Sequence, residues 1–231
     1  MTRKTFVLTL FLAIALCLGY SGITADDQDK KAEDPKKSEI TDKEAKLEHP
    51  IRHKDNPIVT LETNLGNLTL ELYRDVAPAH ADSFLARTED GFYDSTIIHR
   101  IVKGFMAQGG NAAVVGKRPV SYTLNAEFND LPHKEGTLSA ARTRDPNSAS
   151  TQFFICFGRN RSTASLDRQY TNYGQLLMGY DVLHKIEEIP VGPSRMMGGE
   201  VSQPLEEVRI LKAYASDAQG NPLNKAESED S

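Results

Sequence analysis

The chain has 231 residues, a formal net charge of -5 and a sequence pI of about 5.7. This length suits one ordinary domain with flanking segments, and the hydrophobic fraction of 39% is enough for a core. The mildly acidic balance provides no basic surface, which argues against a primary role on nucleic acid or on an anionic membrane.

Residues 1–25 have the order of a secretory signal peptide. Arg3 and Lys4 precede an apolar run that ends at Leu18, and small residues follow up to Ala25. The run of about 13 strongly apolar residues is shorter than the roughly 20 that span a bilayer. We therefore predict cleavage near Ala25, export to the periplasm or the outside, and no stable membrane insertion afterwards. A retained anchor and a lipoprotein cleaved at Cys17 are the alternatives.

Cys156 is the only cysteine that remains after such a cleavage, so the mature chain cannot form an internal disulfide. Its neighbours Phe154, Ile155 and Phe157 predict a buried strand thiol rather than a nucleophile.

Residues 26–56 are dense in Lys, Asp and Glu and contain almost no large apolar side chain. Such a segment cannot bury enough surface to offset the entropy lost on ordering, so we predict a disordered linker.

Alternating apolar residues from Ile58 onward predict a β-hairpin with one buried face. The apolar positions are Val59, Leu61, Leu68, Leu70 and Leu72, on either side of a turn at residues 64–67. Residues 77–89 predict an amphipathic helix with Pro78 in its first turn and Gly91 as its stop. Residues 111–132 are rich in turn-forming residues, and Glu127 is expected to brace the loop that they form.

Apolar runs farther along predict more strands, at residues 136–139, 152–157, 173–177 and 204–214. A short helix after Gly179, with Val182, Leu183 and Ile186 facing inward, ends before Pro190. Residues 159–170 form a polar loop and residues 215–231 an acidic tail, predicted to be disordered. Many strands with two separated helices predict an all-β barrel or sandwich.

The stretch from Ile97 to Gly110 carries the strongest indication of function. Arg100 stands among apolar residues in a run typical of a buried strand, where a charge needs a reason. Spacing alone leaves two interpretations. Arg100 either lies on the solvent face of an edge strand, or the residues after Gly104 fold back beside it and place a cation next to an apolar pocket.

Residues 99–110 read His-Arg, two apolar residues and a spacer, then Gly-Phe-Met, one residue and Gln-Gly-Gly. This pattern resembles the first signature of the cyclophilin-type peptidyl-prolyl cis/trans isomerases, except that Ile98 stands where the family usually has an aromatic residue. Residues 138–143 and 150–155 are similar to the second signature of the family. The segment 141–143 looks more like bacterial members than eukaryotic ones.

The resemblance implies a mainly β fold, a closed eight-stranded antiparallel barrel capped by two α-helices, over residues 57–214. It also implies a monomeric isomerase that assists the folding of exported proteins, with proline-containing polypeptides as partners and without cofactor or metal. Rotation about an Xaa-Pro bond breaks no covalent bond but crosses a barrier of about 18–20 kcal/mol. The catalyst must therefore hold the proline ring and favour the twisted amide.

Carried over residue by residue, the resemblance assigns Arg100 as the catalytic guanidinium and Gln108 as a donor to a substrate carbonyl. The walls of the proline pocket would be Phe105, Met106, Phe154 and Leu166. Ala141 and Arg142 would present backbone groups to the extended peptide, Gln152 would line the groove or orient Arg100, and Tyr170 stands where relatives have a pocket histidine. His99 is expected to be buried and hydrogen-bonded within the sheet, without acid/base work.

The sequence leaves two alternatives to isomerase activity. The first is a cyclophilin-like binding module that holds proline-bearing segments as a chaperone, with turnover incidental. The second, a hydrolase on a β scaffold, lacks a recognisable nucleophile with its base. Ser165 replaces the aromatic residue that many relatives have at this place, which predicts weaker binding of the family's cyclic peptide inhibitor.

Overall fold

A computed structural model describes residues 47–223 of the chain. The predicted signal peptide, residues 26–46 of the predicted linker and residues 224–231 of the predicted tail lie outside the described residues. Among the helices of residues 47–223, none combines the length and the apolar character that a membrane crossing requires.

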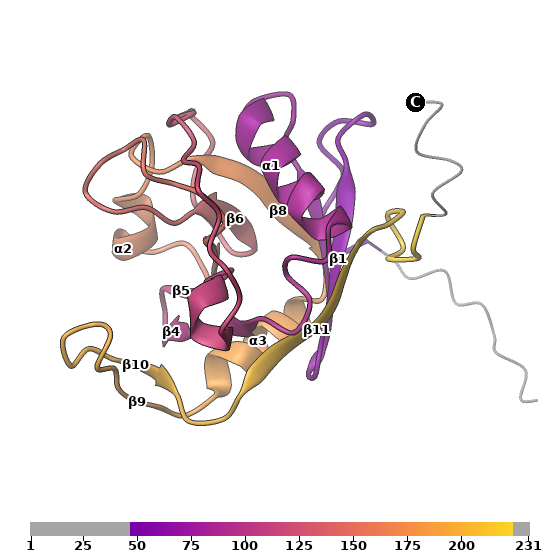
Figure 1. Cartoon of the computed structure of the whole chain (residues 1–231). Coiled ribbons are helices and arrows are strands. Elements are labelled where there is room, and N and C mark those ends of the chain that lie inside the picture. Colours follow the sequence, from indigo (N-terminus) through magenta and orange to yellow (C-terminus); the bar gives the residue numbers. More distant parts are fainter. Residues whose placement is uncertain (1–46, 224–231) are drawn as a thin grey trace, which may run out of the picture. The chain divides into compact units, whose positions relative to one another are not determined.

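A single antiparallel sheet of nine strands, in the order β3-β11-β1-β2-β8-β6-β7-β5-β4, forms the body of the domain (Figure 1). Only His99 separates the two outermost strands, β3 and β4, so the sheet closes on itself through one interrupted strand. With β3 and β4 counted together, the predicted eight-stranded barrel is confirmed. The strands are β1 Ile58–Thr63, β2 Gly66–Leu72, β3 Ile97–Ile98, β4 Arg100–Val102, β5 Met106–Gly109, β6 Thr137–Ala140, β7 Phe153–Cys156, β8 Asn172–Met178 and β11 Val208–Ala215.

The predicted hairpin at the start of the domain is present as β1 and β2, with Thr63 opposite Gly66 at its turn. All five of its predicted core residues are buried, namely Val59, Leu61, Leu68, Leu70 and Leu72. Because side chains alternate between the faces of a strand, this pattern fixes which face of the hairpin turns into the barrel.

Helices α1 (Pro78–Glu89) and α3 (Tyr180–Glu188) lie on opposite sides of the barrel, as Figure 1 shows. Val182, Leu183 and Ile186 of α3 are buried, as predicted. The Glu127 carboxylate accepts hydrogen bonds from the backbone N–H groups of Ala79 and His80 at 3.0 Å, where α1 has no side-chain cap of its own. Glu127 therefore caps the helix and ties the long loop to it.

Two shorter helices lie within the loops. The 3₁₀ turn η1 covers Ala112–Val115, and α2 covers Arg161–Ala164 inside the segment predicted to be only a polar loop. The Asn160 side chain accepts from the N–H groups of Ser162 and Thr163 and so starts α2.

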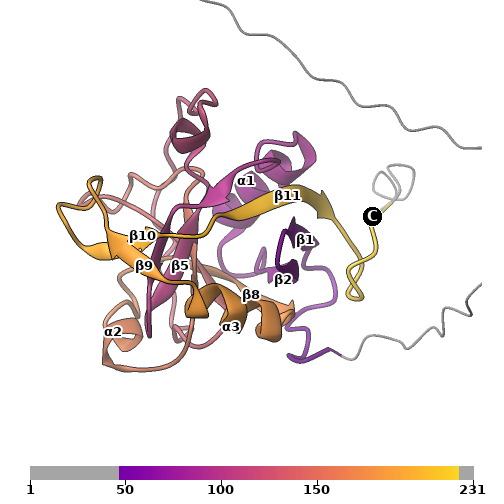
Figure 2. The same ribbon diagram turned by 90° about the horizontal axis from the view of Figure 1, so that it is seen from below.

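A hairpin of β9 (Val191–Pro193) and β10 (Val201–Pro204) projects from the barrel as a separate two-stranded sheet. The sequence predicted a last strand from residue 204 onward, but that strand begins at Val208. Gly198 and Gly199 adopt positive φ angles of 62° and 93°, which allows the chain to reverse between β9 and β10. The hairpin lies beside β4, as Figure 1 shows, and Figure 2 shows it projecting from the barrel.

Residues 47–56, assigned by the sequence to the disordered linker, are held against the barrel. The buried Glu71 carboxylate accepts from the backbone N–H groups of Arg52 and His53 and from the Asn56 amide at 2.8 to 3.0 Å. At the other end, Ser216 forms a β-bridge with Pro222, so the described part of the predicted tail is also attached. The polar composition of these segments could not predict the contacts, because they depend on one buried carboxylate, Glu71, and on backbone pairing at Ser216.

Candidate active site

The strand register brings the two signature motifs together on the outer face of the barrel. Arg100 lies opposite Gln108 in the β4–β5 pair, and Gln108 lies opposite Phe154 in the β5–β7 pair. On β5 the side chain of Ala107 joins the main core, whereas Met106 packs in a second cluster with Phe154, Cys156 and Leu166. The alternation of strand side chains thus separates the core from this second cluster.

A cavity of about 110 Å³ lies over the second cluster. Nine of the ten predicted site residues line it, namely Arg100, Phe105, Met106, Gln108, Ala141, Arg142, Phe154, Leu166 and Tyr170. A larger hollow of about 500 Å³, between the end of α1 and β11, is lined by Glu89, Asp90, Asp94 and Lys212 among others. Tyr214 and Leu223 are the large apolar side chains in its lining, whereas five such side chains line the smaller cavity, which is therefore the better candidate site.

The polar side of the cavity is a chain of hydrogen bonds that begins at Arg100. Its Nη1 donates to Gln108 Oε1 at 3.2 Å and lies 3.7 Å from Met106 Sδ. Gln108 Nε2 in turn donates to Gln152 Oε1 at 3.0 Å. Gln152 is absent from the cavity lining, and its contact with Gln108, which in turn contacts Arg100, fits the second of its two predicted roles.

On its other edge, the Arg100 guanidinium is paired with a residue that the sequence did not single out. Nε and Nη2 donate to the two carboxylate oxygens of Glu200 at 2.7 and 2.8 Å. Glu200 lies in the β9–β10 hairpin, 100 residues away in sequence. The sequence offers no periodicity or motif that joins the two, because the contact depends on where the hairpin folds.

The apolar side of the cavity continues into an aromatic pair at its rim. The rings of Phe154 and Tyr170 meet edge to face with centroids 5.9 Å apart. The Arg142 guanidinium lies 4.2 Å from the centre of the Tyr170 ring, and the carbonyl of Gln169 accepts from it at 2.8 Å. Such a stack is a cation–π contact, so Arg142 contributes a side-chain wall beyond its predicted backbone role.

The Ala141 backbone only partly fits its predicted role. Its N–H donates to the carbonyl of Gln152 at 3.0 Å, which leaves the Ala141 carbonyl as the group it can offer to a peptide. Ser165 is exposed, and its hydroxyl donates to the carbonyl of Ser162 at 2.7 Å.

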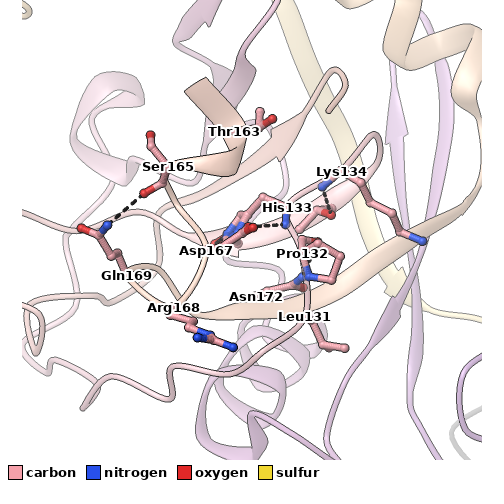
Figure 3. Close-up of polar contacts among 12 residues, drawn as sticks. Leu131, Pro132, His133, Lys134, Thr163, Ser165, Asp167, Arg168, Gln169 and Asn172 are labelled. Carbon is pink, nitrogen blue, oxygen red and sulfur yellow. Dashed lines mark hydrogen bonds and ion pairs between the residues drawn. The ribbon is translucent and has the colours of Figure 1, made fainter. Parts of the chain in front are cut away.

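The loop that carries Leu166 and Tyr170 is tied to His133 through its own Asp167. Figure 3 shows His133 and Asp167 turned toward each other, and His133 Nδ1 lies 3.2 Å from Asp167 Oδ1. The Arg159 guanidinium donates to both Asp167 oxygens at 3.0 and 2.7 Å. The buried His133 ring also stacks on Phe154, with centroids 6.2 Å apart. This cluster of Arg159, Asp167 and His133, which we name the loop brace, supports the floor and the wall of the cavity together.

Electrostatics keep the loop brace in one ionisation state at neutral pH. The Arg159 hydrogen bonds, followed by those from His133, lower the pKa of Asp167 to about 2. Burial lowers the pKa of His133, so its imidazole is neutral. Ser139 Oγ lies 3.0 Å from His133 Nε2, an order that resembles a hydrolase triad, but Ser139 is fully buried and its hydroxyl also donates to the carbonyl of Thr171. A substrate cannot reach it there.

His99 and Cys156 are both buried beside the site. Burial, with a smaller effect of the Arg100 charge, lowers the pKa of His99 to about 4. The predicted burial is confirmed. Within residues 47–223 neither ring nitrogen has a partner in full hydrogen-bond geometry, and a weak contact with the Ile97 backbone stands where a hydrogen bond within the sheet was predicted. Burial raises the pKa of the Cys156 thiol to about 12, as expected for an inert strand residue.

The family model described as "Cyclophilin type peptidyl-prolyl cis-trans isomerase/CLD" matches residues 58–215. The chain belongs to the cyclophilin family. A peptidyl-prolyl cis-trans isomerase of Acinetobacter baylyi is 35% identical over 67% of this chain and 85% of its own length. One of Arabidopsis thaliana is 38% identical over 71% of this chain and 98% of its own length. A bacterial and a plant relative are thus similarly close, and the likeness to bacterial members stays a prediction.

Solved cyclophilins also share the fold. A cyclophilin type peptidyl-prolyl cis-trans isomerase of Cryptosporidium parvum, determined in the presence of the dipeptide ala-pro, is 30% identical. It has a TM-score of 0.61, and the match covers 69% of this chain and 99% of that one. The protein is therefore a cyclophilin-type peptidyl-prolyl cis-trans isomerase, whose substrates are proline-containing polypeptides.

Replacement of the buried His99 should change how the stability of this cyclophilin depends on pH. A histidine with a lowered pKa in the folded state stabilises it above its unfolded pKa of 6.5 and loses that contribution as the pH falls toward about 4. We expect the wild-type free energy of unfolding to lose up to about 3 kcal/mol from this source across that window. Denaturant titrations between pH 7 and 4 should show a flatter profile for His99→Asn.

The matched control is His53→Asn, because His53 is exposed. This variant should keep the wild-type profile. An unchanged profile in His99→Asn would contradict the burial of an uncharged imidazole at this position.

Loss of the Asp167 charge should loosen the loop brace. Asp167→Asn removes the carboxylate that pairs with Arg159, and we expect a melting temperature lower by roughly 5 °C and a raised KM for a proline peptide. The control is Asp130→Asn, because Asp130 pairs with Arg168 in a fully exposed position. Calorimetry and steady-state kinetics should leave Asp130→Asn at wild-type values. Equal effects of the two variants would show that the loop brace does not support the site.

Proposed function

We propose that this cyclophilin accelerates rotation about the Xaa-Pro bonds of exported polypeptides, with Arg100 as the residue that acts on the reacting amide. One observation carries the assignment. The Arg100 side chain is 19% exposed and lines a cavity that also has Phe105, Met106, Phe154 and Leu166 in its wall. A cation in such a place is costly to bury unless it serves a purpose and is paired.

The apolar walls of the cavity would hold the proline ring. Burial of a small apolar group removes surface from water and fixes the position of the ring in the cavity. Gln108 and the Ala141 carbonyl would hold the backbone on either side, so that rotation is confined to the one bond between them. The stack of Arg142 on Tyr170 forms the rim at which the peptide leaves the cavity.

The Arg100 guanidinium would lower the barrier by favouring the twisted amide. As the bond twists, resonance is lost, and the prolyl nitrogen becomes pyramidal and regains a lone pair that can accept a hydrogen bond. A donor fixed beside it gains more in this state than in either planar state, which is the condition for catalysis. A charge-assisted hydrogen bond contributes about 1.5–3 kcal/mol, or roughly one to two decades of rate.

Two further arguments support the proposal. Rotation needs no nucleophile or proton transfer, which agrees with an inert Cys156 thiol and a neutral, buried His99 next to the site. In addition, the related Cryptosporidium parvum structure was determined in the presence of the dipeptide ala-pro, a ligand of this chemical kind.

Arg100→Ala should lower kcat/KM for a short Xaa-Pro peptide by at least about ten- to a hundredfold while the fold is retained. The measurement is protease-coupled kinetics or exchange spectroscopy, with circular dichroism as the check on folding. Arg118→Ala is the control, because Arg118 is exposed and lies outside the cavity. Full activity of Arg100→Ala would defeat the assignment. Undiminished protection of an unfolded client by an inactive Arg100→Ala protein would favour a chaperone role.

Export rests on the N-terminal pattern of two basic residues, an apolar run and small residues up to Ala25. Mass spectrometry of the protein recovered from its native cells should give a mature chain that begins near residue 26, found in the periplasm or the medium. A chain that retains Met1 and stays in the cytoplasm would contradict export but leave the isomerase assignment untouched.

A further inference from the structure

The pairing of Arg100 with Glu200 is the feature of the site that the family signatures do not account for. Both carboxylate oxygens of Glu200 accept from the guanidinium, at 2.7 and 2.8 Å. The two side chains are 19% and 38% exposed, so the pair is partly shielded from water on the Arg100 side. Such bidentate pairs fix the plane of a guanidinium as well as its position.

A count of donors shows what the pairing does to Arg100. A guanidinium has five N–H groups in a rigid fork. Glu200 takes the Nε–H and one Nη2–H, and Gln108 takes one Nη1–H. The second Nη1 N–H points to Met106 Sδ at 3.7 Å, a weak acceptor in the cavity wall, so one Nη2 N–H remains without a partner within the described residues. The edge that contains Nε therefore faces the hairpin.

The hairpin holds Glu200 in a defined place. The carbonyl of Glu200 accepts from the N–H of Ser194 at 2.7 Å, and its N–H donates to the carbonyl of Met197 at 3.2 Å. The N–H of Gly199 donates to the carbonyl of Ser194 at 2.8 Å. Both backbone groups of Glu200 are thus fixed within the turn, and the hairpin itself lies beside β4, the strand that carries Arg100 (Figure 1).

The pair does not close the site. With Glu200 bound to it, Arg100 still lines the cavity of about 110 Å³ together with Gln108 and Met106. Glu200 itself is absent from the cavity lining. A carboxylate that withdrew Arg100 from the pocket would have removed it from that lining, so the geometry fits support of the guanidinium rather than its sequestration.

We propose that Glu200 is a positioning residue, which fixes the plane of the Arg100 guanidinium so that its Nη end stays at the lining of the proline pocket. This inference rests on the proposed function of Arg100 and adds the residue that holds its guanidinium in place. The hydrogen bonds from Arg100 lower the pKa of Glu200, so the carboxylate is charged at neutral pH and the pair is present under working conditions. Through Glu200 the β9–β10 hairpin is then part of the active site.

The test is Glu200→Gln, which keeps the size of the side chain but presents an NH₂ group to an N–H of the guanidinium. Two donors then face each other, and the guanidinium loses its fixed plane. We expect kcat for a short Xaa-Pro peptide to fall about fivefold to twentyfold with KM changed less than twofold, because an interaction of the transition state is lost while the pocket is intact. Glu200→Asp, which retains the carboxylate, should recover part of the lost kcat.

The matched control is Glu206→Gln, because Glu206 is an exposed carboxylate six positions further along and forms no ion pair within the described residues. It should keep wild-type kcat. A spectroscopic readout is the Arg100 Nε–H resonance, which should be sharp and slowly exchanging in the wild type and broadened in Glu200→Gln. Circular dichroism establishes that each variant is folded.

Combination with Arg100→Ala separates the two proposals. If Arg100→Ala is inactive and Glu200→Gln has wild-type kcat, the positioning role is overturned and the role of Arg100 stands. A rise in kcat in Glu200→Gln would equally overturn it, because the pair would then restrain Arg100. If Arg100→Ala is itself active, the catalytic role of Arg100 is contradicted, and the positioning role of Glu200 is overturned with it. The positioning role further requires that Glu200→Gln cause no additional loss in the Arg100→Ala background.

Discussion

The site depends on keeping one guanidinium charged, fixed and partly dry beside an apolar cavity. Arg100 meets this constraint through three residues on two elements: Glu200 of the β9–β10 hairpin on one edge, and Gln108 and Met106 of β5, which both contact Nη1. A cation left without these partners would turn toward water, because its hydration is worth more than contact with apolar walls. The remaining features of the site serve to keep these partners in place.

Strand register is the means by which a β-barrel meets this constraint. Ala107 points into the core while Met106 and Gln108, its neighbours on β5, line the cavity on the outer face. A slip of one residue would exchange the two faces, burying the amide and exposing the core side chain. Gly110 adopts a φ of +78°, and a Cβ there would collide with the Thr151 carbonyl, so this glycine permits the close approach of β5 to the strand that carries Phe154.

The features of the fold and of the site that could be predicted are those that depend on local sequence patterns. The leucines of the first hairpin, the buried face of α3 and the residues around the cavity follow from periodicity or from the family signatures. Glu200, the attachment of residues 47–56 by Glu71, and the support of Phe154 by His133 could not be predicted. Each is a side-chain contact between segments that no periodicity or motif links. At His99 the burial follows from its neighbours, whereas the hydrogen bond expected for it is reduced to a weak contact with the Ile97 backbone.

The most direct test of the central claim is a crystal structure of the protein with a bound Xaa-Pro peptide. The account predicts a proline ring seated among Phe105, Met106, Phe154 and Leu166, with an Nη donor of Arg100 within about 3 Å of the amide that joins the proline to the preceding residue. Glu200 should still occupy the Nε edge of the guanidinium in that complex. A peptide bound elsewhere, or an Arg100 side chain turned away from the ring, would contradict it.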